Sequence, residues 1–168
     1  LPDDDAVSEP ESILRAVQFE DYAVKPLLVG GAMFHLDNRT VLYTQGERIN
    51  PSRMWNMPSA GLDYNFDFAA SPLRDAPERH QRVDSDYNGW WMCLIPVTVL
   101  KEIGLSQPFF IKFDDIEFCL RARRHGCPTV CLPGVAVWHQ AWHDKDPTRG
   151  WEEYFIQRNR WISALLCF

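Results

Sequence analysis

The sequence predicts an α/β fold, and two observations lead to that class. Continuous apolar runs of strand length alternate along the chain with stretches of helical periodicity, the pattern of folds in which helices cover a sheet. The chain has 168 residues, a length that suits one domain with a sizeable core. Apolar side chains make up 46% of it, which excludes a disordered chain, and it contains no run of about 18 apolar residues that could span a membrane.

The first half of the chain is expected to hold one helix and two strands. Ser8 and Glu11 form a capping-box pattern with a proline between them, which predicts that a helix of about ten residues follows. A buried strand is predicted over 27–36, where a pair of glycines indicates a bulge or a close backbone approach. The returning strand is predicted over 40–49. Residues 50–86 lack periodicity and are expected to form a long ordered loop, of the kind that often serves a site.

The second half alternates strands with helices. A strand over 88–96 is apolar throughout and therefore suits burial on both faces. A short helix over 97–103 and a longer one over 114–125 are each followed by a glycine that ends them. A strand is predicted over 129–138 with an interruption at a Pro-Gly pair, and an amphipathic helix is predicted from Thr148 onward.

Charge is concentrated at one end of the chain. The net charge is −6, and residues 1–21 hold seven acidic side chains but one basic side chain. This balance argues against a nucleic-acid partner, because neutralising phosphates needs a basic face. The five cysteines include no CxxC pair and no pairing at zinc spacing, so we expect reduced, buried thiols in a cytosolic protein.

Two acidic runs could carry chemistry. The carboxylates of Asp3-Asp4-Asp5 repel one another unless a cation lies between them, and hard oxygen ligands favour Mg²⁺, Mn²⁺ or Ca²⁺. The alternative is a solvated acidic turn that helps to cap a helix. The second run, Asp114-Asp115-Ile-Glu117, opens the longer predicted helix. Its carboxylates either complement the helix dipole or include a general base that takes a proton from an attacking alcohol.

A histidine and a pair of tryptophans are further candidates. His139 follows the last predicted strand, where it could complete a metal site begun by aspartates; a structural histidine is the alternative. Trp90 and Trp91 follow a glycine, and adjacent strand residues point to opposite faces of a sheet. One indole is therefore expected in the core and the other at a cleft, stacked on the apolar face of a sugar, unless both belong to the core or to a contact with a partner.

Taken in order, these motifs resemble the C-terminal half of the inverting family 2 glycosyltransferases of the GT-A fold. The family pattern is an Asp-rich motif, a Gly-aromatic apolar strand, a short helix ending in glycine, an aromatic stretch that leads into an acidic helix start, and a strand ending in histidine. The corresponding pieces of this chain are Asp3–Asp5, Gly89–Ile95, Ile103-Gly104, Phe109–Arg121 and Val137–His139.

The resemblance implies a Rossmann-like domain with a mixed sheet flanked by helices. It also implies that residues 1–168 are a single fragment of the catalytic domain, which starts at the Asp-rich motif and lacks the upstream nucleotide-binding half and the downstream region. A divalent cation, Mn²⁺ or Mg²⁺, would be held by Asp3, Asp5 and His139. Asp115 corresponds to the catalytic base, with Asp114 beside it. The implied substrate contacts are Trp90, Trp91, Glu117, Glu47, Trp55 and Asp4.

Three segments narrow the resemblance. Residues 90–91, 113–117 and 138–143 are similar to the polymerising galactofuranosyltransferases of mycobacterial and other actinobacterial cell walls. This implies a nucleotide-sugar donor, UDP-galactofuranose, and a lipid-linked glycan acceptor, the growing galactan, linked alternately through O5 and O6. The implied location is the cytoplasm, with peripheral contact at the cytoplasmic face of the plasma membrane. The sequence leaves the oligomeric state open, and a homo-oligomer is among the alternatives.

Other interpretations of the same residues remain. A non-catalytic carbohydrate-binding module would use exposed tryptophans and keep the acids and the histidine as relics. A metal-dependent hydrolase would need more ligands to position a water, and none has a convincing spacing. An enzyme needs Asp5, His139 and Asp115 along one cleft, whereas a binding module could scatter them. The apolar side of 151–166 suits a membrane surface, and packing against the rest of a longer protein explains it equally well.

Overall fold

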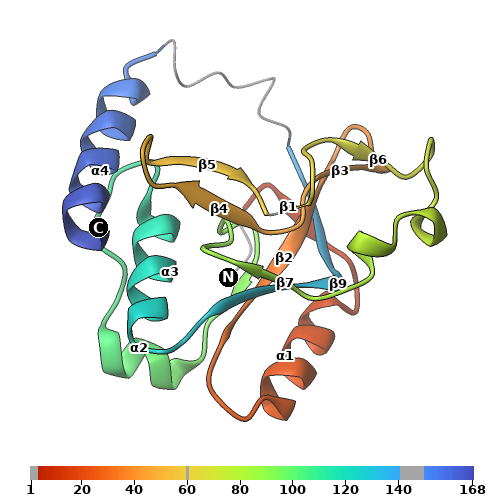
Figure 1. Cartoon of the computed structure of the whole chain (residues 1–168), viewed down its shortest axis with the longest axis horizontal. Helices are drawn as coiled ribbons and strands as arrows, with labels where there is room; N and C mark the ends of the chain where they lie inside the picture. Colours follow the sequence, from red (N-terminus) through yellow and green to blue (C-terminus); the bar gives the residue numbers. More distant parts are fainter. Residues whose placement is uncertain (1–3, 60, 141–149) are drawn as a thin grey trace.

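The computed structural model describes residues 4–59, 61–140 and 150–168, and a mixed sheet lies at its centre (Figure 1). Two long strands, β2 (Leu28–His35) and β9 (Thr129–His139), run parallel to each other there. The strand order of the sheet is β1-β9-β2-β3-β6; in addition, β7 pairs with β9 and β8 pairs with β2. Apart from β2 with β9, all of these pairs among the described residues are antiparallel. Their bounds are β1 (Ala6–Ser8), β3 (Val41–Thr44), β6 (Phe66–Asp67), β7 (Val83–Ser85) and β8 (Cys93–Leu94). The predicted α/β fold with a mixed sheet is confirmed.

The parallel pair decides where a ligand could bind. Its register places His35 opposite His139 at the carboxyl ends of the two strands, the edge at which open α/β sheets bind ligands. The predicted close approach occurs at Gly30, where a Cβ atom would clash with the side chain of Asn88. The predicted interruption of β9 is also present, because pairing with β2 passes from Cys131 directly to Ala136.

Helices cover both faces of the sheet. On one face, α1 (Ser12–Tyr22) packs on β9 and β2. On the other lie α2 (Val97–Ile103), α3 (Asp114–Arg124) and α4 (Glu152–Cys167), with α4 against α3. Neighbouring residues of β2 show the division, since Leu28 belongs to the apolar cluster that contains Phe118 of α3 and Val29 to the cluster that contains Ala16 of α1.

The predicted helices of the second half are confirmed closely. Helix α2 has the predicted bounds, and α3 ends one residue before the prediction. Gly104 and Gly126 follow them with φ of +80° and +83°, a conformation that glycine adopts without strain. The start predicted for the last helix, Thr148, lies outside the described residues, and α4 is described from Glu152.

The capping box predicted at Ser8 is wrong. Ser8 is the last residue of β1 and pairs with Val137 of β9, and α1 begins at Ser12 after Glu11. The Ser12 hydroxyl donates to the Ala136 carbonyl at 2.8 Å. The residues that local sequence assigns to a helix cap therefore form a strand. They do so because β9, which is distant in the sequence, satisfies their backbone hydrogen-bonding groups.

Two predicted strands are shorter than expected. The strand over 40–49 breaks at Gly46, whose φ is +76°, so β3 stays on the main sheet while β4 (Glu47–Asn50) pairs with β5 (Trp55–Pro58) in a separate hairpin. The strand over 88–96 reduces to β8. The tryptophan pair before β8 lies in a turn, so alternation along a strand is not the reason for its orientation.

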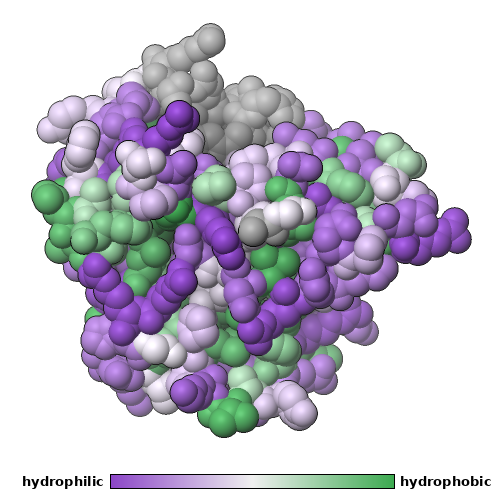
Figure 2. All heavy atoms as spheres, viewed as in Figure 1, coloured by the Kyte–Doolittle hydropathy of each residue, from purple (hydrophilic) through white to green (hydrophobic). Residues whose placement is uncertain are grey.

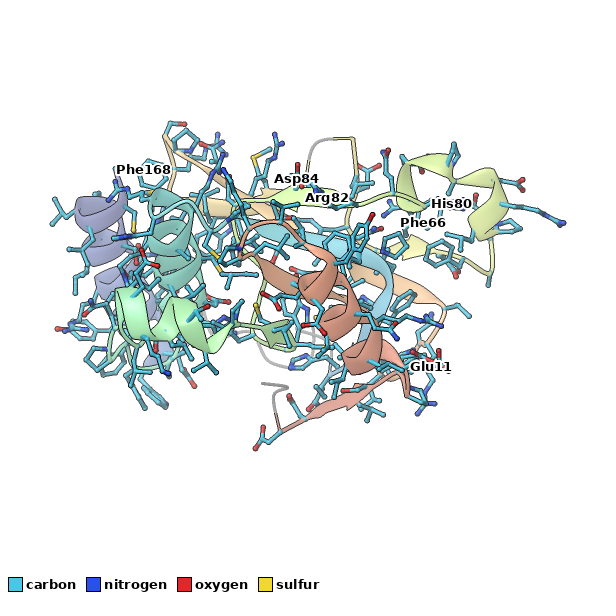
Figure 3. The ribbon with its side chains drawn as sticks, turned by 90° about the horizontal axis from the view of Figure 1, so that it is seen from below. Glu11, Phe66, His80, Arg82, Asp84 and Phe168 are labelled. Atoms are coloured by element: carbon cyan, nitrogen blue, oxygen red, sulfur yellow. The ribbon has the colours of Figure 1, made fainter. Side chains whose placement is uncertain are left out.

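The stretch predicted as a long ordered loop contains short elements. It holds β5, β6 and β7 and two 3₁₀ turns, Leu73–Asp75 and Pro77–Arg79. In Figure 3, Phe66 and His80 from this stretch lie at the end of the molecule opposite Phe168, with Arg82 and Asp84 of the β7 region between them. The stretch therefore extends the sheet away from α4.

The surface and the cysteines complete the description. All five cysteines are buried and form no disulfide bond, as predicted. Among the described residues, no helix is long and apolar enough to cross a membrane. Apolar side chains gather on the surface of α4, at the left of Figure 2, where Leu165 is 85% exposed.

Candidate active site

An aspartate and a histidine meet at the carboxyl end of the parallel pair; we call Asp5 and His139 the Asp–His end. The antiparallel pairing of β1 with β9 sets Ala6 opposite His139, which brings the preceding Asp5 beside the imidazole. Asp5 Oδ1 lies 2.8 Å from His139 Nε2. His139 Nδ1 is 2.8 Å from the carbonyl oxygen of Gln140. Because a carbonyl only accepts, Nδ1 carries the hydrogen and Nε2 faces the carboxylate, which is the orientation of histidine ligands to metals.

The rest of the predicted metal set is only partly visible. Asp4 is exposed, and Asp3 lies outside the described residues. Within the described part of the chain, no three His, Cys, Asp or Glu side chains are grouped so that they could hold a metal ion. The fit of a divalent cation therefore depends on two observed donors. The carboxylate oxygen suits Mn²⁺ or Mg²⁺, and the oriented imidazole nitrogen is a ligand that favours a transition-metal ion.

A second group of acids lies where α3 begins, on the same upper side of Figure 1 as the end of β9. Phe113 precedes the helix in the left-handed conformation, with φ of +79°, and Asp114 and Asp115 occupy the first turn. Asp115 Oδ1 accepts from the Ile116 N–H at 2.7 Å. Burial, and secondly the charge of Asp114, raise the pKa of Asp115 to about 7, against a lowering by Lys112.

Glu47 belongs to the same group, and we call Asp114, Asp115 and Glu47 the carboxylate end. Glu47 is the first residue of β4 and is 2% exposed. Its carboxylate accepts from Tyr64 Oη at 2.7 Å, from Tyr87 Oη at 2.9 Å and from Asn56 Nδ2 at 2.9 Å. Burial raises its pKa, and its charge contributes to the raised pKa of Asp115. Glu47 is thus an electrostatic neighbour of the predicted base, held by neutral donors.

Glu117 is placed differently from the expectation of a substrate contact. Its side chain is 2% exposed and forms two hydrogen bonds with Arg121, at 2.7 and 3.1 Å. Arg121 also donates to the carbonyls of Ile103 and Leu105, so the pair ties α3 to the end of α2. The acidic start of α3 therefore contains one residue of the scaffold as well as the candidate base, a difference that the spacing of acids does not reveal.

The two tryptophans diverge, as predicted, although they lie in a turn. Trp90 packs edge-on against Phe118 of α3, with ring centroids 5.8 Å apart. Its indole nitrogen is buried, and no hydrogen-bond partner for it is found among the described residues. Trp91 lies on the other side and donates to the Gly31 carbonyl at 2.7 Å. Both rings are half-buried, so Trp91 has a fixed polar contact and Trp90 keeps a free donor.

Aromatic rings join the two ends. Tyr43 contacts His35, Trp91 and Tyr64, with centroid separations of 5.9, 6.4 and 4.9 Å, and Tyr64 continues to Glu47. We call His35, Tyr43, Tyr64 and Trp91 the aromatic wall. The wall starts beside the Asp–His end, because His35 is the register partner of His139. Sequence reasoning missed Tyr43 and Tyr64, whose strand and loop positions carry no motif that distinguishes them.

Trp55, the remaining predicted contact, lies at the start of β5 and is 40% exposed. The guanidinium of Arg160 of α4 lies 5.4 Å from its ring centroid. A separate polar hollow of about 500 Å³ lies beyond the β4–β5 hairpin and is lined by Arg48, Arg82 and Arg123 among others. None of the predicted site residues lines that hollow, so the candidate site is the aromatic wall with its two ends.

These features match what glycosyl transfer requires: a carboxyl group that titrates near neutrality, an Asp–His pair suited to a cation, and rings that suit the apolar faces of sugars. The comparison with protein families agrees. The chain belongs to the glycosyltransferase-like family 2, whose family model matches residues 1–164. The family predicted from the motifs is therefore confirmed.

Two curated relatives match nearly the whole chain. "Galactofuranosyltransferase GlfT2" of Mycobacterium tuberculosis (strain ATCC 25618 / H37Rv) is 45% identical over 168 residues, which is 98% of this chain. The protein of the same name from Mycolicibacterium smegmatis (strain ATCC 700084 / mc(2)155) is 46% identical over 169 residues, again 98% of this chain. Each match covers 26% of the relative, so the chain spans about a quarter of the length of these proteins.

Proposed function

We propose that the full-length protein transfers galactofuranose from UDP-galactofuranose to a growing cell-wall galactan, with Asp115 as the general base. The observation that carries the proposal is the placement of Asp115 at the start of α3, half-buried beside Asp114 with its pKa raised to about 7. Such a carboxylate is deprotonated in a large fraction of molecules at neutral pH and is still basic enough to accept a proton. The names of the two mycobacterial relatives support the sugar and the donor class.

The chemistry needs one displacement. The acceptor hydroxyl oxygen forms a bond to the anomeric carbon while the bond from that carbon to the diphosphate oxygen breaks, and Asp115 takes the hydroxyl proton. The nucleoside diphosphate leaves with the bonding electron pair, and attack from the opposite side inverts the anomeric centre. No covalent sugar–enzyme intermediate is required. This agrees with the burial of all five cysteines, of which Cys93, Cys127, Cys131 and Cys167 have pKa values raised mainly by burial or by a neighbouring thiol.

The Asp–His end would face the donor. Asp5 and His139, with Asp3 from the Asp-rich motif, would hold a divalent cation, Mn²⁺ or Mg²⁺. When bound, such a cation neutralises the charge that develops on the departing diphosphate. The chain's own part is to orient the ligands: β1 pairing sets Asp5 beside the imidazole, and the Gln140 carbonyl sets the histidine tautomer. A lipid-linked acceptor, peripheral contact with the plasma membrane and a homo-oligomer stay predictions from the sequence.

The decisive experiment is Asp115→Asn in the full-length protein, assayed for galactofuranose transfer. Asparagine keeps the size of the side chain and its contact with the Ile116 N–H but cannot accept the proton. We expect turnover to fall by roughly 10²–10⁴-fold with donor affinity nearly unchanged. Asp84→Asn, at an exposed aspartate of β7 that pairs with Arg82, is the matched control and should transfer at the wild-type rate.

Two outcomes would contradict the proposal. Transfer by Asp115→Asn at a rate close to wild type would show that Asp115 is not the base, and Asp114 would become the candidate. A wild-type protein that binds galactan but transfers no sugar, with any divalent metal, would favour the carbohydrate-binding module.

A further inference from the structure

The backbone directly before α3 is strained. Ile111 and Phe113 have φ of +67° and +79°, in the left-handed region that residues other than glycine rarely adopt. A β-branched residue such as isoleucine is an outlier there, at a cost of about 1–3 kcal/mol. Such a conformation persists only where the surrounding structure holds it. Asp114 and Asp115 follow this segment immediately, so the residues that hold the segment also affect the position of the two aspartates.

Asn159 of α4 contacts the strained segment on both sides of Ile111. Its Nδ2 donates to the carbonyl of Phe110 at 2.8 Å and to the carbonyl of Lys112 at 2.9 Å. Arg158 Nη1 donates to Asn159 Oδ1 at 2.9 Å, which fixes the nitrogen of the amide on the side of the carbonyls. Asn159 is 0% exposed, so no water can replace these bonds.

The segment in turn sets the helix start. The Phe113 carbonyl accepts from the Glu117 N–H at 2.9 Å, and this bond opens the first turn of α3 that carries Asp115. A change at Ile111 therefore reaches Asp115 through four peptide units of backbone, without any contact between Asn159 and the substrate.

We propose that Asn159 is a positioning residue of the transferase, which holds Asp115 in its reactive place by clamping the carbonyls of Phe110 and Lys112. The proposal rests on the function proposed above and extends it to α4. A displacement of about 1 Å at a reacting group can cost about 10²-fold in rate, so a clamp on the adjoining backbone has a measurable effect.

The chain offers an isosteric test and a matched control. Asn159→Asp keeps the shape but sets a carboxylate oxygen against two carbonyl oxygens, and Asn159→Ala removes both donors. Asn159→Gln keeps the carboxamide and should recover part of the lost rate. Ser163→Ala is the control: Ser163 lies one turn further along α4, is 0% exposed, and its hydroxyl has no hydrogen-bond partner among the described residues.

The variants are measured in the full-length protein beside Asp115→Asn. We expect Asn159→Asp and Asn159→Ala to lower kcat by about 10²-fold, to leave the Kd for UDP-galactofuranose within twofold, and to speed hydrogen exchange in residues 108–118. The acidic limb of the pH–rate profile should move to lower pH, because a loosened segment lets water reach Asp115, which is faced by Asp114, Lys112 and Glu47. Ser163→Ala should change none of these.

The two proposals fail in different ways. If Asp115→Asn abolishes transfer but the Asn159 variants keep wild-type kcat and pH profile, the positioning role is wrong and the general base stands. If the Asn159 variants and Ser163→Ala lose kcat and thermal stability in the same proportion, the effect belongs to helix packing and the positioning role is again wrong. If Asp115→Asn transfers normally, the base assignment fails, and with it the positioning role.

Discussion

Asp5, which directly precedes β1, and Asp115, in the first turn of α3, are both aspartates, yet their neighbours are opposite in character. Asp5 lies 2.8 Å from an imidazole nitrogen, a group that can carry or share positive charge. Asp115 lies beside Asp114 and within electrostatic reach of Glu47, and its opposing charge is Lys112. One carboxylate lies against an imidazole, while the other is crowded by acids.

This difference separates two tasks that one kind of side chain can perform. Near a cation a carboxylate stays ionised and serves as a ligand, whereas burial beside like charge raises its pKa and makes it a base. Glu117 shows a third outcome for an acid of the same helix start, since its pairing with Arg121 makes it part of the scaffold. The neighbours of each acid, more than its own type, decide its task.

The largest expected effect is a pH-dependent change in the free energy of unfolding when Asp115, at the carboxylate end, is replaced. The pKa of Asp115 rises from 3.8 to about 7 on folding. The stability that this side chain contributes to the folded state is therefore fully present below pH 3.8, where it is protonated, and is lost as the pH rises through 7. Asp115→Asn removes that loss. We expect the free energy of unfolding of the variant to exceed that of wild type by on the order of 3 kcal/mol at pH 8, and by much less at pH 4. Denaturant unfolding of the full-length protein at both pH values measures it.

An equal gain at both pH values, or none at pH 8, would show that the environment of Asp115 does not disfavour its charge. The two ends would then not differ in the way that the structure indicates. Asp84→Asn serves again as the control, because the side chain of Asp84 is 65% exposed and should show no such pH dependence.

The next effect concerns the Asp–His end. His139→Ala removes the oriented imidazole, and we expect the concentration of Mn²⁺ needed for half-maximal transfer to rise by at least 10–100-fold, the range typical of lost outer-shell partners. Titration of the chelated full-length protein with Mn²⁺ measures this. His125→Ala, at an exposed histidine after α3, is the control. An unchanged Mn²⁺ requirement in His139→Ala would remove this end from the metal site.

The smallest effect tests the rings between the two ends. Trp91→Phe loses the hydrogen bond to the Gly31 carbonyl and should cost about 1 kcal/mol of stability. Trp90→Phe loses a buried indole N–H that has no partner within the described residues, so its stability should change less. If Trp90 contacts the acceptor, its variant should instead raise the acceptor KM. The reverse pattern, with Trp90→Phe the less stable variant, would make Trp90 a core residue only.

Local sequence predicted the parts of this molecule that depend on short-range signals. The bounds of α2 and the inward residues of α3 follow from apolar periodicity and terminal glycines, and Ile116, Cys119 and Leu120 are buried as predicted. The candidate base at Asp115 and the metal pair of Asp5 and His139 follow from motifs that occur in a set order. The order of these motifs predicted the family, which the family match confirms, whereas the roles of Asp115, Asp5 and His139 stay predictions.

Prediction failed where distant backbone competes with local preference. Ser8 has a good capping pattern, but β9 pairs with it and takes it into the sheet. The hydrogen bonds to Glu47 come from Asn56 and Tyr64, which lie in the stretch that lacks periodicity, and from Tyr87 directly after it. No local pattern brings such residues together, because their meeting depends on how the β4–β5 hairpin folds over the sheet.

The sequence by itself determined the family and the α/β class and supplied the candidate site residues, since these depend on residue type and order along the chain. Tertiary structure alone decided which acid does what. Burial raises the pKa of Asp115, Arg121 engages Glu117, and Asn159 of α4 clamps the strained backbone before α3. Solvent exposure and the nearest charge set the free energy of a carboxylate, and both are properties of packing in space rather than of position in the chain.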